Sequence, residues 1–112
     1  MARDIARTTT TIANGATTSA AVTLDRQRTL LGFFTPASLT GTAFTFSASI
    51  DADGTSYLPV YNAGTEYSVT VGTSRYVSVN TEVFHGIKLF KIISGSSEAA
   101  ARTITVVSGE VQ

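Results

Sequence analysis

The sequence predicts an all-β protein, a two-sheet antiparallel β-sandwich or jelly roll of eight to nine short strands. Three observations support this fold class. Apolar residues alternate with hydroxyl residues along several short runs, turn residues recur throughout the chain, and 19 Thr and 12 Ser occur among 112 residues. Alternation gives a strand one apolar face, and regular turn signals between short strands are typical of sandwiches. The β-branched Thr side chain suits a pleated, half-exposed surface.

The clearest element is a β-hairpin over residues 42–61, around which the remaining strands are expected to pack. Its first arm, FTFSASI, has an apolar residue at every second position. The motif Asp51-Ala52-Asp53-Gly54 then predicts a turn, because Asp favours the first turn position and Gly tolerates a positive φ. The second arm is expected to place Leu58 and Val60 on one face. Pro59 places this arm at a sheet edge or a bulge, since proline cannot donate to a central ladder.

Three strands are expected before the hairpin, namely Thr8–Ile12, Ala16–Leu24 and Arg28–Phe34. The turn pair Asn14-Gly15 separates the first two, and the second has Ala20, Val22 and Leu24 on one face. The third, RTLLGFF, is apolar on both faces, with Leu31 and Phe33 on one and the neighbouring leucine and phenylalanine on the other. Such a strand is predicted in the middle of a sheet or beneath another layer.

Four further strands are expected after the hairpin, namely Thr65–Val71, Arg75–Val79, Ile87–Ser94 and Arg102–Val107. The turn motif Asn62-Ala63-Gly64 leads into the first of them. The segment Thr81–Phe84 is the one plausible helical turn. Asn80 is a suitable cap for it, and Phe84 is expected to fill one end of the sandwich.

Composition limits the domain organisation and the partners. The length indicates a single domain, assigned to residues 8–112, preceded by an arm over residues 1–7 that lacks the apolar region of a secretory signal. Eight basic and eight acidic residues give a formal net charge of zero, so no nucleic-acid partner is expected. No apolar run approaches the roughly 20 residues that span a bilayer, so no membrane association is expected. The low charge content favours packing against neighbouring subunits in a homo-oligomer.

Catalytic and metal-binding motifs are weak. Cysteine is absent, which excludes disulfides and thiolate metal sites. The single histidine, His85, follows Phe84 in a predicted loop, and no serine lies in a nucleophile-elbow motif. The pair Asp51 and Asp53 suggests calcium, but the glycine and the terminal glutamate of an EF-hand loop are missing, and a turn is the better interpretation. We therefore expect no enzyme activity, no cofactor and no metal.

Three groups of residues carry a family resemblance that covers nearly the whole chain. They are TTIANG at residues 10–15, the hairpin with DGTSY at residues 53–57, and the tail with RYVSV, IKL and RTITV between residues 75 and 106. This order resembles a group of small proteins encoded among the structural genes of tailed bacteriophages. The resemblance implies a virion component with a β-sandwich fold, a capsid decoration (cement) protein or a related particle-surface module. It implies no catalytic residues.

The expected function is therefore that of a non-enzymatic structural protein on the surface of a bacteriophage capsid. The major capsid protein or another virion protein is the expected partner, and the arm residues Arg3, Ile5 and Arg7 are the candidate contacts, with residues 107–112 adding reach. One alternative is a glycan-binding module of a tail or fibre, motivated by the four tyrosines and by a resemblance of the hairpin to discoidin-like sandwiches. Another alternative is a head–tail joining or tail component.

Overall fold

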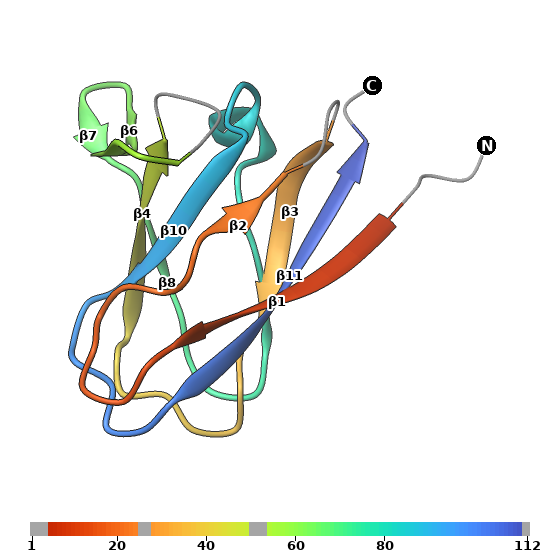
Figure 1. Ribbon diagram of the computed structural model, residues 1–112. Helices are drawn as coiled ribbons and strands as arrows, with labels where there is room; N and C mark the ends of the chain where they lie inside the picture. The colour runs from red at the N-terminus through yellow and green to blue at the C-terminus, as the bar shows by residue number, and fades with distance from the viewer. Residues whose placement is uncertain (1–4, 25–27, 50–53, 111–112) are drawn as a thin grey trace.

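The protein is an all-β sandwich, which confirms the predicted fold class. A computed structural model describes residues 5–24, 28–49 and 54–110, and these form eleven strands and one short 3-10 helix. Figure 1 shows the two layers nearly edge-on. The elements are β1 (Ile5–Ile12), β2 (Val22–Thr23), β3 (Arg28–Phe34), β4 (Ala43–Ser49), β5 (Tyr57–Pro59), β6 (Tyr61–Asn62), β7 (Thr65–Glu66), β8 (Ser68–Thr70), β9 (Tyr76–Ser78), η1 (Thr81–Phe84), β10 (Leu89–Ser94) and β11 (Arg102–Glu110).

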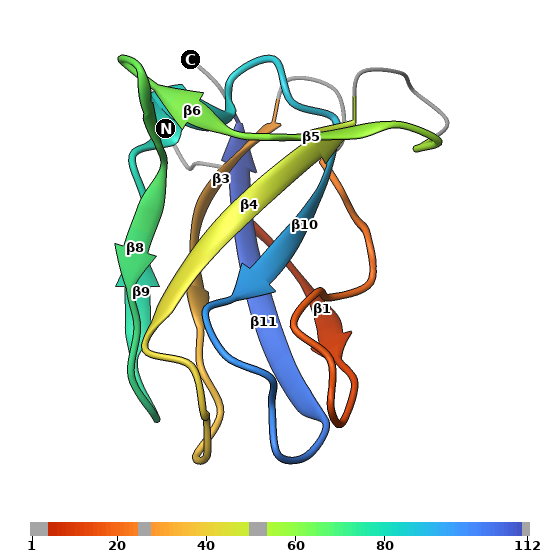
Figure 2. The same ribbon diagram turned by 90° about the vertical axis from the view of Figure 1, so that its left-hand side faces the viewer.

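Two antiparallel sheets form the sandwich. The first has the strand order β1-β11-β3-β9, and the second has the order β2-β10-β4-β5, with β8 also paired to β4. Figure 2 looks onto the second sheet, with β3 and β11 of the first sheet behind β4 and β10. Strands β6 and β7 form a separate two-stranded hairpin. The strand count exceeds the expected eight or nine because the chain between Tyr57 and Thr70 is divided into four short strands.

The core lies between the two large sheets and is built on clustered phenylalanines. The ring of Phe46 lies 5.2 Å from the ring of Phe84 at an interplanar angle of 89°. Phe33 packs against Phe46 from the opposite sheet, and the two ring centroids lie 6.3 Å apart. Edge-to-face and tilted contacts of this kind are favoured by the ring quadrupoles. The fully buried apolar residues are Ile12, Leu30, Phe33, Phe44, Phe46, Phe84, Phe90, Ile92 and Ile104.

The predicted hairpin is confirmed, and Leu58 and Val60 of its second arm share one face as expected, although the two residues are not equally buried. Strand β4 pairs with β5 in antiparallel register, and β5 lies at the sheet edge, as Pro59 predicted. Val60 is buried, but Leu58 is 57% exposed. Leu58 pairs with Ala48 on the inner face of β4, so it faces inward at the rim of the sheet, beyond the main core. The predicted turn Asp51-Ala52-Asp53 lies outside the described residues.

The central position of β3 is confirmed, but the predicted division of its side chains between two faces is wrong. The strand pairs with β11 and β9, and its register with β11 shifts so that Leu31 has no partner. This β-bulge inserts one residue and reverses the alternation. Leu30 and Phe33 are therefore fully buried in the core, while Leu31 and Phe34 lie on the outer face, with Phe34 40% exposed.

The first two strands also differ from expectation. Strand β1 begins at Ile5, three residues earlier than predicted, and pairs with β11 along its whole length. The predicted strand Ala16–Leu24 is largely a crossing segment, because residue 18 bridges to β10 while Ser19 bridges to β1. Only Val22–Thr23 forms a strand, and Ala20 is exposed rather than facing inward.

The later part of the chain follows the prediction closely. The turn before β7 has Ala63 at φ 55° and Gly64 at φ 84°, which is the left-handed conformation that a two-residue hairpin connection requires. The segment Thr81–Phe84 is a 3-10 helix, and the Asn80 side chain accepts a hydrogen bond from the Glu82 N–H at 3.1 Å. Strand β11 runs three residues further than predicted, so residues 108–110 are paired within the sheet and do not reach beyond it as expected.

Candidate functional site

A largely apolar patch lies on the outer face of the sheet β1-β11-β3-β9. On β1, Thr10 and Ile12 are buried in the core, so the side chains of Ile5 and Arg7 project from the opposite, outer face. Ile5 is 41% exposed. Cross-strand register then places Arg7 beside Val107 on β11. The outer patch consists of Ile5, Arg7, Leu31, Phe34, Tyr76 and Val107.

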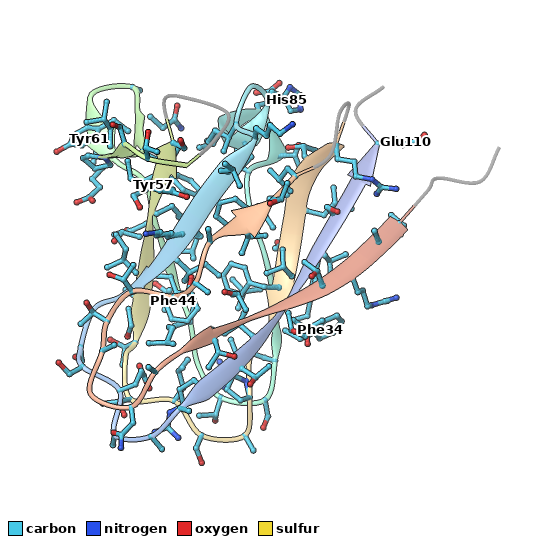
Figure 3. All side chains as sticks on the ribbon, viewed as in Figure 1. Phe34, Phe44, Tyr57, Tyr61, His85 and Glu110 are labelled. Atoms are coloured by element: carbon cyan, nitrogen blue, oxygen red, sulfur yellow. The ribbon has the colours of Figure 1, made fainter. Side chains whose placement is uncertain are left out.

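Two aromatic rings form one end of the outer patch. Phe34 on β3 pairs directly with Tyr76 on β9, and their ring centroids lie 4.8 Å apart at an interplanar angle of 53°. Phe34 is 40% exposed and Tyr76 is 44% exposed. Figure 3 shows Phe34 projecting away from the core, on the side of the molecule opposite Tyr61. The two rings therefore present aromatic surface to any protein that contacts this sheet.

Two glycines inside strands form the floor of the outer patch. A Cβ atom on Gly32 would collide with the ring and hydroxyl of Tyr76, which shows that Tyr76 lies across β3 at this position. A Cβ on Gly109 would lie 2.8 Å from Leu31 Cδ1 and 3.3 Å from Ile5 Cδ1. Glycine within a strand often marks such a close approach. Tyr76 and the two aliphatic side chains therefore lie close against the sheet.

Two of the three predicted contact residues belong to this surface. Ile5 and Arg7 are both in β1, held against β11 by the sheet, so they are part of a rigid face and not of a loose arm. Arg3 lies outside the described residues. Sequence patterns did not identify Phe34 and Tyr76 as members of the same surface, because the two residues are distant in the chain and meet only when β3 pairs with β9.

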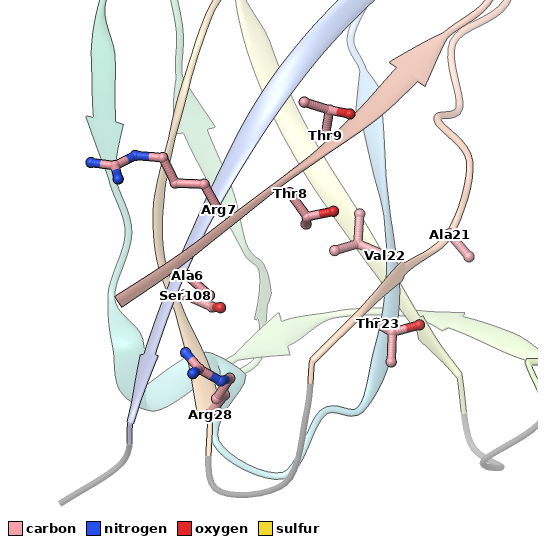
Figure 4. Close-up of a pocket in the computed structure, with 9 residues that line it drawn as sticks. All are labelled: Ala6, Arg7, Thr8, Thr9, Ala21, Val22, Thr23, Arg28 and Ser108. Carbon is pink, nitrogen blue, oxygen red and sulfur yellow. The ribbon is translucent and has the colours of Figure 1, made fainter. Parts of the chain in front are cut away.

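A polar groove of about 360 Å³ lies next to the outer patch, between β1 and β2. Figure 4 shows Thr8 and Val22 pointing toward each other across this groove, while the Arg7 side chain extends away from it. Small side chains and hydroxyl groups dominate the lining, and Arg28 stands at one end. The groove exists because β2 is only two residues long and pairs with β10, so it does not reach β1.

A buried carboxylate, Glu98, joins two loops at one end of the sandwich. It is 1% exposed and accepts four hydrogen bonds. Its Oε1 accepts from the Thr40 N–H at 2.8 Å and from Arg102 Nε at 2.9 Å, and its Oε2 accepts from the Gly41 N–H at 2.9 Å and from the Ser94 hydroxyl at 2.8 Å. The carboxylate therefore ties the β3–β4 loop to β10 and to the loop before β11.

These contacts set the protonation state of Glu98. Burial acts to raise the pKa, but the Thr40 N–H, the Arg102 side chain, the Gly41 N–H and the Ser94 hydroxyl outweigh it and lower the pKa from 4.5 to about 2. Hydrogen bonds and a neighbouring cation that favour the charged form act in this direction. A carboxylate that is ionised, enclosed and fully hydrogen-bonded is a structural tie and a poor proton acceptor at neutral pH.

The other candidate residues from the sequence do not converge. His85 follows η1 in an exposed position, and within the described chain its side chain meets no carboxylate. Among the tyrosines, Tyr67 is structural, because its hydroxyl accepts a hydrogen bond from the Asn80 N–H at 2.8 Å. Tyr57 is in β5 and Tyr61 is in β6, and Figure 3 shows both far across the molecule from Phe34. The tyrosines therefore do not form one shared platform.

The described residues form neither a metal-binding cluster nor a membrane-spanning helix. In residues 5–24, 28–49 and 54–110, no group of three or more His, Cys, Asp or Glu side chains is arranged to hold a metal ion. No helix in the same part of the chain is long and apolar enough to cross a membrane.

Comparison with known proteins finds no matching family model, no matching curated protein and no matching solved structure. The class of protein defined by fold and site is thus an all-β sandwich with an apolar outer patch.

Proposed function

We propose that this chain is a non-enzymatic structural protein of a tailed-bacteriophage virion, a capsid decoration (cement) protein that docks on the capsid through the outer patch. The observation that carries this proposal is the exposed aromatic pair Phe34 and Tyr76, on the same outer sheet face as Ile5 and Arg7. Contiguous exposed apolar surface marks interaction sites, and aromatic and arginine side chains supply most of the binding energy at protein interfaces.

The physical properties of the chain suit attachment to a repeating surface. The formal net charge is zero, so neighbouring copies do not repel one another over long distances. A lattice presents many equivalent sites, and contacts that are weak individually gain strength when adjacent copies also touch. We expect the major capsid protein or another virion protein as the main partner, with further contacts between copies of this chain. The capsid surface is the proposed location.

The proposal is tested by reconstitution on capsids that lack this protein. Purified wild-type protein is expected to sediment with such capsids, whereas the double variant Phe34→Ser with Tyr76→Ser should bind at least about tenfold more weakly, because loss of an aromatic anchor costs about 2 kcal/mol. Tyr61→Ser is the matched control, since Tyr61 is an aromatic residue that is 59% exposed outside the outer patch. It should bind like the wild type.

Three results would refute the proposal or favour an alternative. Capsids that take up another surface protein of the same phage, but not this one, would exclude decoration. Specific glycan binding that Tyr61→Ala abolishes would favour the sugar-binding alternative. Rings of fixed copy number, detected by mass photometry, would favour a head–tail or tail component.

A further inference from the structure

Strand β1 forms a long and open sheet edge. It has eight residues, whereas the other strands at sheet edges, β2, β5, β8 and β9, have two or three each within the described chain. Proteins usually protect edges by keeping the edge strand short or by covering it, because an exposed row of N–H and C=O groups can pair with another strand. Among the described strands, β1 is the edge that departs from this rule.

The exposed backbone groups of β1 can be assigned residue by residue. At the far end of the strand, the Ala20 N–H donates to the Thr11 carbonyl at 3.2 Å, so the backbone groups of Thr11 point away from β11. Strand geometry repeats every two residues, and the register with β11 has no interruption. The N–H and C=O groups of Ile5, Arg7 and Thr9 therefore point to the same free side. None of them has a hydrogen-bond partner on that side among the described residues.

The groove between β1 and β2 gives this edge room for a further strand. A strand that pairs with residues 5–9 would direct every second side chain toward the gap between the two sheets. The groove has a volume of about 360 Å³ and is lined by short side chains such as Thr8 and Val22. Main-chain pairing supplies affinity in strand addition, and pockets for alternate side chains supply specificity. Edge and groove together have both parts of such a site.

Charge indicates the chemistry of the partner. Arg7 is the one charged residue in β1, and it has no ion-pair partner among the described residues. Of the residues that line the groove, none is Asp or Glu. A second copy of this chain fits poorly, because antiparallel pairing of residues 5–9 with themselves would place two Arg7 side chains directly opposite each other. Like charges in that position are unfavourable.

We propose that the free edge of β1 between Ile5 and Thr9 binds an extended, acidic segment of a partner protein by strand addition, with a carboxylate of the segment beside Arg7. This edge is separate from the aromatic part of the outer patch, and the proposal holds for any partner that carries such a segment. It can therefore fail while the capsid proposal stands, and the reverse is also true.

The test uses the whole purified protein, labelled with nitrogen-15, and NMR titration with a synthetic peptide. The probe has the sequence Thr-Val-Glu-Val-Thr-Val-Glu-Val, and a matched peptide has lysine in place of both glutamates. We expect shifts of the amide signals of Ile5, Arg7, Thr9 and Val22, and slower hydrogen exchange at the amides of Arg7 and Thr9. The glutamate peptide should bind about threefold to tenfold more tightly than the lysine peptide, as expected for an exposed charge pair.

Three variants and one modified peptide separate main-chain pairing from charge. Thr9→Pro removes an N–H that points away from β11, so the ladder to β11 is kept and peptide binding should be lost. Thr9→Val retains the N–H and should bind normally. Arg7→Gln should abolish the preference for the glutamate peptide while keeping residual binding. A peptide methylated on alternate backbone nitrogens should not bind, and this measurement holds even where a variant is destabilised.

Several results would overturn the proposal. They include no amide shifts at millimolar peptide, shifts confined to the outer patch around Phe34, equal binding of both peptides, and unchanged binding by Thr9→Pro. Dimers of the free protein that dissociate in Thr9→Pro, measured by analytical ultracentrifugation, would assign the edge to a second copy instead of an acidic partner.

Discussion

Replacement of the buried carboxylate by its amide, Glu98→Gln, is the most informative test of how the sandwich is held together. The glutamine oxygen can occupy the position that accepts from Thr40 and Arg102, but its NH₂ group then faces the Gly41 N–H. The Ser94 hydroxyl can rotate and accept, whereas the Gly41 N–H is left without an acceptor. The substitution thus leaves one buried donor unpaired and removes the charge that faces Arg102.

The expected cost is about 3 kcal/mol in the free energy of unfolding at pH 7. An unpaired buried donor costs about 1–3 kcal/mol, and loss of one partner from a buried ion pair costs about 3–5 kcal/mol. The pKa of Glu98, lowered from 4.5 to about 2, independently corresponds to about 3 kcal/mol of preferential stabilisation of the carboxylate. Both routes give the same magnitude.

The pH dependence provides a second readout with a defined sign. Because the pKa of Glu98 is lower in the folded state, its stabilising contribution is complete above pH 4.5 and is lost as the pH falls from 4.5 toward 2. The difference in unfolding free energy between wild type and Glu98→Gln should therefore be largest near neutral pH and vanish near pH 2. Urea denaturation followed by circular dichroism measures both proteins across this range.

The control for this experiment is Glu66→Gln, which changes an exposed carboxylate in β7. It should alter the free energy of unfolding by less than about 0.5 kcal/mol. Two outcomes would refute the assignment of Glu98 as a structural tie. One is a loss of less than about 1 kcal/mol in the unfolding free energy of Glu98→Gln at pH 7, about a third of the expected cost. The other is a difference between the two proteins that stays constant from pH 7 to pH 2.

Three further substitutions test packing, capping and the floor of the outer patch by urea unfolding at pH 7. Phe84→Ala should destabilise the protein by about 3–5 kcal/mol, because the fully buried ring contacts several others; a loss below about 1 kcal/mol would contradict this. Asn80→Ala should cost about 1 kcal/mol by removing the cap of η1, while Asn80→Asp should retain most of it. Gly32→Ala should cost about 1–3 kcal/mol, since the new Cβ meets Tyr76 and lies 2.5 Å from the Val77 carbonyl oxygen. Adding Tyr76→Ala should recover only part of this loss, and full recovery would show that the carbonyl contact is unimportant.

Local sequence signals were sufficient where one short segment determines its own conformation. The turn at Ala63 and Gly64 and the capped helical turn after Asn80 are of this kind, because their backbone angles follow from adjacent residues. The strand Arg28–Phe34 was also predicted with its correct bounds, since a run that is apolar on both faces needs cover on both sides.

Features that depend on distant segments could not be predicted in the same way. The bulge at Leu31 appears only when β3 is paired with β11, and it places Leu30 on the inner face together with Phe33. Glu98 receives its hydrogen bonds from Thr40 and Gly41, which lie more than fifty residues away in the chain. The one available signal was a single carboxylate in a loop of small residues, GSSEAAA, and this signal does not identify its partners.

The pairing of β1 with β11 has a consequence for synthesis of the protein on the ribosome. Ile5 pairs with Gly109, so strand β1 cannot complete its pairing with β11 until almost the whole chain has emerged from the ribosome. Contacts between residues so distant in the chain slow folding, and a strand that stays unpaired can mispair or aggregate. Nascent chains stalled before Arg102 should therefore bind chaperones, and release of the final strand should end that interaction.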